Sequence, residues 1–192
     1  MAPSWSNAIY RWIAVTLALS VIAWLDGGFL AHWLALAPAR IWRGEIWRLV
    51  TWVFVEDSPM SVAITCIAIY RFGGELAPRW GTRRLQRFML ELVLVVGVAT
   101  ALVGLAFHDV WRLHRLGGWV VSDVLIIAWA RQFPTATLNM WGMVQLRGMQ
   151  VIAFTIGFIV LIALAIGPLW IVPELVAVFA AFLYPLERLR VL

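Results

Sequence analysis

The fold is indicated most clearly by the residues from Trp47 to Gly81, WRLVTWVFVEDSPMSVAITCIAIYRFGGELAPRWG. Trp47 and Arg48 are expected at a water-facing edge, and an apolar run from Met60 to Phe72 follows a short acidic step. A Gly-Gly pair and four arginines come next: Arg79, Arg83, Arg84 and Arg87. An apolar segment that ends in a basic flank is typical of a membrane span with a cytoplasmic end.

The composition of the whole chain indicates an integral membrane protein. Hydrophobic residues make up 64% of the 192 residues and charged residues only 13%, more apolar surface than a soluble domain of this size can bury. The net charge of +5 comes from arginine alone. These arginines alternate with apolar runs instead of forming one basic face, so we expect no nucleic-acid partner. The single Cys66 excludes an intrachain disulfide and makes a metal site unexpected.

Six apolar segments predict an all-α integral membrane protein with six transmembrane helices in a single domain, residues 1–192. The predicted spans are 8–25, 60–72, 85–107, 116–130, 149–166 and 171–183. The tryptophans and arginines of residues 26–57 predict a loop in the outer interface, and Pro134 and Gly142 predict a loop over 131–148. In the third span, Gly97, Ala101 and Gly104 place small residues on one face for close packing.

The arginines also predict the orientation. With the N-terminus inside, ten of them flank the inner ends of the spans and five the outer ends. We therefore expect both termini in the cytoplasm, and a location in a bacterial inner membrane.

The Trp47–Gly81 stretch resembles the rhomboid superfamily, whose pattern contains a Trp-Arg-x-x-Thr entry and a Gly-Gly exit. Trp47, Arg48, Gly73, Gly74 and Gly81 fit this pattern without a gap. The resemblance implies a six-transmembrane-helix rhomboid-like bundle. In rhomboid proteases the second span carries a His and, four residues later, an Asn that help to hold the oxyanion. Ser61 and Thr65 occupy those positions here.

The resemblance does not extend to the catalytic residues. Rhomboid proteases use a Gly-x-Ser-Gly serine on the fourth span and a histidine on the sixth. Here Trp119 follows Gly117-Gly118, Ser122 lies further along the helix, and the sixth span contains no histidine. We therefore predict no protease activity and expect the Ser122 hydroxyl to bond its own backbone. The three histidines fall in outer connections, where a solvated surface role is expected: His32, His108 and His114.

The second half of the chain resembles the derlins. Trp129-Ala-Arg131-Gln-Phe-Pro134 precedes Leu138-Asn139-Met140-Trp141-Gly142, which is similar to the derlin pattern of Trp-x-Arg and Pro followed by Met-Asn-aromatic-aromatic-Gly. Derlins are rhomboid-fold pseudoproteases, and the resemblance implies that the chain binds membrane clients.

Three acids lie within predicted spans: Glu91, Asp123 and Glu174. Glu91 is expected to pair with Arg84 or Arg87 on the same helix. Asp123 and Glu174 lie at similar depths, so we expect them to be close and at least one of them to be protonated. They then either bond each other or bind a polar group of a partner helix. In the alternative interpretation, each bonds a local neighbour. An aspartyl protease would also need two acids, but its Gly-x-Gly-Asp step is absent.

The residues therefore favour a catalytically inactive protein that binds transmembrane helices of partners or clients. Asp123 and Glu174 are the expected contacts, with Ser61, Thr65 and Ser122 marking the former active-site pocket. No cofactor is expected, although a bound lipid is compatible with the sequence. Two alternatives remain: a permanent accessory subunit of a large membrane complex, such as a photosynthetic or respiratory one, and an intramembrane protease with non-standard residues.

Overall fold

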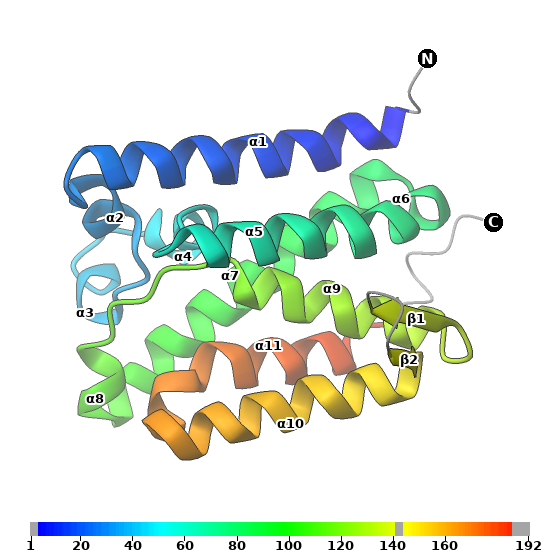
Figure 1. Ribbon diagram of the computed structural model, residues 1–192. Helices are drawn as coiled ribbons and strands as arrows, with labels where there is room; N and C mark the ends of the chain where they lie inside the picture. The colour runs from blue at the N-terminus through cyan, green and yellow to red at the C-terminus, as the bar shows by residue number, and fades with distance from the viewer. Residues whose placement is uncertain (1–3, 141–143, 186–192) are drawn as a thin grey trace.

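The computed structural model describes residues 4–140 and 144–185 of the chain. Its long helices are α1 (Ser4–Leu25), α7 (Thr82–Ala106), α9 (Trp119–Gln132), α10 (Gly148–Ile166) and α11 (Val172–Leu183). A further helix runs from α5 (Pro59–Ala68) through the π-helical η2 (Ile69–Gly73) into α6 (Gly74–Trp80). These helices lie side by side in one bundle, and α1 begins at the same end of it at which α11 finishes (Figure 1).

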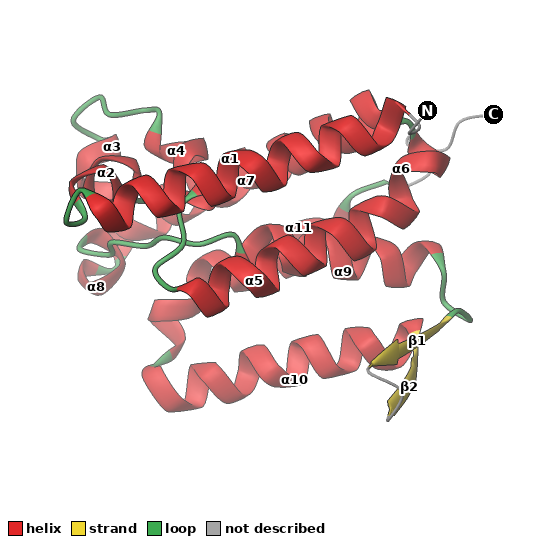
Figure 2. Ribbon diagram, turned by 45° about the horizontal axis from the view of Figure 1, so that its top comes forward, coloured by secondary structure: helices red, strands yellow, loops and turns green. Residues whose placement is uncertain are grey.

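Shorter elements connect the long helices. Between α1 and α5 the chain forms α2 (Phe29–Leu34), α3 (Pro38–Ile41), α4 (Arg48–Thr51) and the 3-10 turn η1 (Trp52–Phe54). The helix α8 (His108–Trp111) follows α7, and the 3-10 turn η3 (Pro168–Ile171) leads into α11. Two antiparallel strands, β1 (Thr137–Met140) and β2 (Val144–Arg147), form a hairpin beside the start of α10 (Figure 2).

The helical architecture confirms the predicted fold class. Four helices of the described residues are long and apolar enough to cross a membrane: Ala8–Leu25, Pro59–Trp80, Thr82–Ala106 and Gly148–Ala165. The apolar segment Pro168–Leu183 is shorter, and α9 has only 14 residues. The count of six spans therefore stays a prediction.

The second span is longer than predicted. We expected it to end at the Gly73-Gly74 pair, but both glycines have helical backbone angles and the helix continues to Trp80. A glycine costs about 1 kcal/mol relative to alanine within a helix. Burial of Leu76 and Trp80, both 0% exposed, outweighs that cost. The chain turns instead at Gly81, where φ is +79°.

The region predicted as a loop over 131–148 contains the β1–β2 hairpin, in which Thr137 pairs with Arg147 and Leu138 with Leu146. The strand pairing was not predicted because the segment combines turn residues with only short apolar runs. Trp141 and Gly142 of the derlin-like stretch lie outside the described residues, as do Arg188 and Arg190 of the predicted inner flank.

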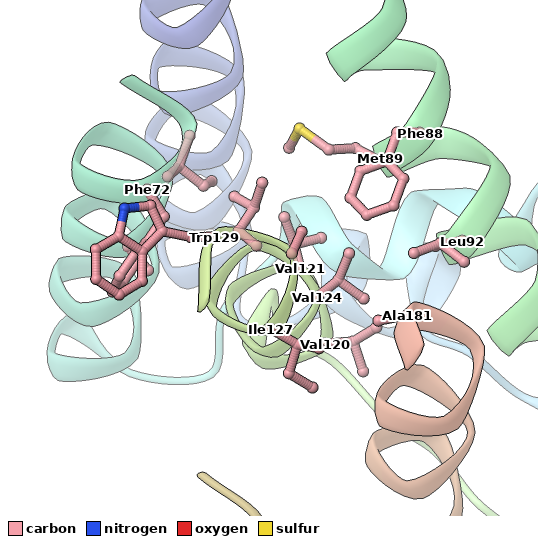
Figure 3. Packing of buried hydrophobic residues seen from close by; sticks show 14 of the residues in the cluster. Phe72, Phe88, Met89, Leu92, Val120, Val121, Val124, Ile127, Trp129 and Ala181 are labelled. Carbon is pink, nitrogen blue, oxygen red and sulfur yellow. The ribbon is translucent and has the colours of Figure 1, made fainter. Parts of the chain in front are cut away.

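The helix α9 lies at the centre of the bundle. It packs against α5, α7, α10 and α11, and Val120, Leu125, Ile127 and Ala128 are completely buried. Figure 3 shows Val120, Val121 and Val124 of α9 among side chains of the surrounding helices. Because α9 is enclosed by protein, it supplies a rigid support for the polar residues at its N-terminal end.

The spacing of the small residues of α7 predicted close packing on one face. They pack against the interfacial segment, residues 26–57, rather than against another long helix. A Cβ atom on Gly97 would lie 2.6 Å from the carbonyl oxygen of Leu49, and one on Gly104 would lie 3.0 Å from Cβ of Pro38. The helices α3 and α4 therefore lie directly on the α7 backbone. The Trp42 indole strengthens this contact by donating to the Ala101 carbonyl at 3.0 Å.

Arg48 does not face water, and this expectation was wrong. Its side chain is 0% exposed. The guanidinium donates to Glu45 Oε2 at 2.6 Å and to the carbonyls of His32 and Ala35 at 2.7 and 2.8 Å. The carbonyls at the end of α2 lack helical partners, and the arginine fork satisfies them. Arg48 thus holds the interfacial segment together, while Trp47 donates to the Trp33 carbonyl.

Candidate functional site

A buried carboxyl group, Glu56, lies where η1, α5 and the start of α9 meet. Glu56 is 1% exposed, and its Oε1 accepts hydrogen bonds of 2.7 Å from both the Thr65 hydroxyl and the Gly118 backbone N–H. The Glu56 backbone N–H donates to Ser20 Oγ at 3.0 Å, and its carbonyl accepts from the Trp24 indole at 3.1 Å. One residue therefore connects α1, α5 and α9.

The start of α9 is built around this carboxyl group. A Cβ atom on Gly118 would lie 2.6 Å from Thr65 Cγ2 and 3.0 Å from Glu56 Oε1, so only glycine fits. The first N–H groups of a helix have no partner within the helix, and a carboxylate suits them electrostatically. Burial nevertheless raises the pKa of Glu56 above its usual 4.5, because the apolar surroundings disfavour the ionised form.

Thr65 therefore has a partner that the sequence interpretation missed. At the position where the resembled proteases hold the oxyanion with an asparagine, the Thr65 hydroxyl holds a resident carboxylate of the chain itself. The second donor, the Gly118 N–H, belongs to the Gly-Gly step that precedes Trp119. Glu56 thus joins α5 to the start of α9.

The two predicted serines have separate surroundings. Ser61 is 7% exposed and its hydroxyl donates to Asp57 Oδ1 at 3.0 Å, while its backbone N–H is capped by Ser58. Ser122 is 3% exposed, and its hydroxyl has no hydrogen-bond partner among the described residues, so the predicted bond to its own backbone is wrong. The structure does not bring Ser61 and Ser122 together with Thr65 in one hydrogen-bonded group.

A cavity of about 290 Å³ is lined in part by the two acids that the sequence singled out, Asp123 and Glu174. Its polar lining comes from Asp57, Arg115, Asp123 and Glu174, and its apolar lining from Leu116, Trp119, Phe158, Ile159, Ile162 and Ile171. The lining residues come from the loop before α5, the start of α9, the middle of α10, and η3 with the start of α11. The cavity therefore lies near the end of the bundle that carries the interfacial segment.

Asp123 and Glu174 line this cavity together, but they are not joined by a hydrogen bond. Arg115 Nη2 donates to Glu174 Oε1 at 2.5 Å, and Glu174 Oε2 has no partner among the described residues. The Asp123 carboxyl lies close enough to Glu174 for the two acids to interact electrostatically. The structure thus brings together the pair that the sequence singled out, and adds an arginine.

The histidines lie away from these serines in the described structure. His32 and His114 stack with ring centroids 4.9 Å apart in the outer connections, and both are exposed, as is His108. Their positions agree with the solvated role expected from the sequence.

The Trp-x-Arg step of the derlin-like stretch joins three helices. The Trp129 indole on α9 donates to Glu75 on α6, which also pairs with Arg71. Arg131 donates to the Ala181 and Tyr184 carbonyls at 2.7 and 3.0 Å, so it caps the end of α11. Glu91 accepts a hydrogen bond from the Tyr184 hydroxyl at 2.7 Å, which links α7 to the residue that follows α11.

The fold and the site define a rhomboid-like membrane protein in which a buried carboxyl group is bonded to the Gly-Gly step at the start of α9. Residues 9–186 match the model of a family described as "Eukaryotic integral membrane protein (DUF1751)", and the chain belongs to this family. It is also similar to plant derlins, which confirms the derlin-like, rhomboid-like assignment and agrees with the prediction that the chain is not a protease.

Three such relatives show the extent of the likeness. Derlin-1 of Oryza sativa subsp. japonica is 28% identical over 54% of this chain and 41% of its own length. Derlin-1.1 of Zea mays is 32% identical over 57% and 44%, and Derlin-1 of Arabidopsis thaliana is 29% identical over 79% and 54%. The chain spans about half the length of the curated relatives it matches.

These comparisons correct the predicted location. The matched family is described as eukaryotic and the three relatives are plant proteins, so the prediction of a bacterial inner membrane was wrong. The prediction of an integral membrane protein is confirmed. Hydropathy and arginine positions indicate that a segment crosses a membrane and in which orientation, but they do not indicate the organism. The sequence reasoning therefore failed on this point.

Proposed function

We propose that this protein binds transmembrane helices of other membrane proteins at the cavity between α9, α10 and α11, without cutting them. The observation that carries the proposal is the composition of the cavity, in which buried acids lie beside an apolar wall from α10 and η3. Ionisable groups at membrane depth are costly and are used to bind polar partners. Asp123 and Glu174 are the proposed contacts, in a single rhomboid-like domain.

The helix α10 suits the role of a side wall. Phe158, Ile159 and Ile162 line the cavity, whereas Val160 and Leu164 are exposed on the opposite face of the same helix. Apolar side chains on the cavity side can pack against a second helix, since helices in a bilayer associate through close van der Waals contact and polar pairs.

A photo-crosslinking residue at position 158 tests the proposal, with the same residue at position 160 as the matched control. Both positions are on α10, and only Phe158 lines the cavity, because Val160 is exposed on the opposite face. We expect crosslinks to membrane proteins from position 158 and mainly to lipid from position 160. The same crosslinked partners from both positions would contradict a specific site in the cavity.

Purification in a mild detergent separates this proposal from a permanent accessory subunit. Several partners that crosslink from position 158, each recovered in substoichiometric amount, would support client binding. One partner in stoichiometric amount, recovered in every preparation, would instead support a subunit of a larger assembly.

A further inference from the structure

The acidic side chains that line the cavity outnumber the basic ones. Asp57, Asp123 and Glu174 contribute three carboxyl groups, and Arg115 is the one basic side chain among the described lining residues. The Arg115 guanidinium is already bonded to Glu174 Oε1 at 2.5 Å. Asp57 is exposed at the rim and accepts from Ser61. Asp123 is therefore the acid inside the cavity that lacks a partner of opposite charge.

The two acids inside the cavity are buried. Asp123 is 8% and Glu174 is 7% exposed. Glu174 Oε2 has no hydrogen-bond partner among the described residues, and Asp123 forms no ion pair with a basic side chain of the described ranges. Leaving buried acceptors without donors is costly, so a group that enters the cavity gains most if it carries several N–H donors and a positive charge.

We propose that the cavity selects transmembrane helices that carry a lysine or arginine, whose cationic head pairs with Asp123. This inference rests on the proposed function and narrows it to one class of client. Among groups that move within a bilayer on a helix, the ammonium and guanidinium are the ones that combine positive charge with three or more donors. Their long apolar stems fit the cavity wall formed by Phe158, Ile159 and Ile162.

The positions of the acids also fix the depth of the basic residue. Asp123 is the fifth residue of α9 and Glu174 the third residue of α11, so they lie ~6 Å and ~3 Å from the starts of their helices, within about one turn. A basic residue about one turn from the corresponding end of a client helix can reach Asp123. A basic residue at the middle of the client helix cannot reach it without moving the helix.

A set of single-span model helices tests this selection. Each helix has a leucine-alanine core with one lysine, one methionine or one glutamate at a scanned position. Binding to the full-length protein is measured in phosphatidylcholine nanodiscs by crosslinking from position 158. We expect the lysine helix to crosslink roughly tenfold better than the methionine helix when lysine is one turn from the end, and the glutamate helix to crosslink worst.

Variants of the protein assign the preference to Asp123. D123N should remove most of the preference for lysine while retaining the methionine helix, and D123K should transfer the preference to the glutamate helix. E91Q, which changes an acid on α7 outside the cavity, should leave the preference unchanged. Thermal unfolding of each variant checks that the fold persists, and the reversal by D123K cannot arise from misfolding.

Failure of the inference is distinct from failure of the proposed function. Methionine and lysine helices that crosslink equally would overturn the inference and leave helix binding intact. No crosslinking of any helix would overturn both. Loss of the lysine preference when phosphatidylethanolamine replaces phosphatidylcholine would identify a lipid amine as the occupant and would also overturn the inference.

Discussion

The Thr65 hydroxyl donates to Glu56 Oε1 at 2.7 Å, and the first turn of α9 is fixed to the same oxygen through the Gly118 N–H. Thr65 stands at the sequence position where the resembled rhomboid proteases carry an asparagine that holds the oxyanion. The contact builds a carboxyl group into the fold and gives this buried acid a role in stability that can be measured.

Glu56 should make the stability of the protein depend on pH. Burial raises its pKa in the folded state above the usual 4.5, so the folded state holds the proton more tightly than the unfolded state does. Its contribution to stability is therefore complete below pH 4.5 and is lost as the pH rises through the folded-state pKa. Thermal unfolding in detergent between pH 4 and 8 should show this loss in the wild type and a weaker pH dependence in E56Q.

The control for this prediction is D109N, which changes an exposed acid on α8. D109N should keep the wild-type pH dependence. An E56Q variant with the full wild-type slope would mean that another group titrates in this range.

Arg48 should be required for the fold of the interfacial segment. R48A removes three hydrogen bonds from a fully buried site and leaves the carbonyls of His32 and Ala35 without their donor. We expect a loss of about 3–5 kcal/mol of stability, with little rescue by R48K because lysine lacks the planar fork. R43A, at an exposed position, should change the melting temperature little. Comparable losses in R48A and R43A would contradict this role.

Gly97 should tolerate no side chain, although it lies within a helix. In G97A the new Cβ would meet the Leu49 carbonyl at 2.6 Å, so α4 must move away from α7. Gly157 on α10 has nothing within 4 Å of an added Cβ, and G157A should be neutral or stabilising by up to about 1 kcal/mol. Opposite shifts of the two melting temperatures are the expected result, whereas equal shifts would contradict direct packing at Gly97.

The sequence predicted those features that depend on local patterns. Apolar run lengths gave the membrane class and the positions of the long helices, and the spacing of Gly97 and Gly104 predicted a close packing face. Two acids at similar depth predicted that Asp123 and Glu174 share one site. Each of these inferences needs only the helical repeat and the hydrophobic pattern.

The missed features depend on tertiary contacts. Glu56 was seen only as part of an acidic step before a span, and its burial results from Gly118, which lies 62 residues later. Arg48 was expected in water because its burial needs carbonyls from α2, 13 and 16 residues away. Arg115 was counted as a flanking charge, and only the structure places it on Glu174.

Arg131 should stabilise the end of α11 from the neighbouring α9. R131A removes a charged donor from the carbonyls of Ala181 and Tyr184 at the end of α11. We expect a loss of about 1–3 kcal/mol, since each contact is a hydrogen bond from a charged donor. R83A changes an exposed arginine at the start of α7 and should have little effect. Faster backbone hydrogen exchange at the end of α11 in R131A alone would locate the effect.

Filling the cavity should block client binding without unfolding the protein. Ile162 lines the cavity and is partly buried, so an I162W indole can occupy part of the roughly 290 Å³ of free space beside it. Leu161 is the next residue on α10 and is 63% exposed outside the cavity lining, so L161W adds the same ring on another face. We expect I162W to lower crosslinking from position 158 several-fold and L161W to leave it unchanged, with both variants melting near the wild type. If both substitutions lowered crosslinking equally, clients would contact the outer surface of α10, because only I162W narrows the space in front of Asp123.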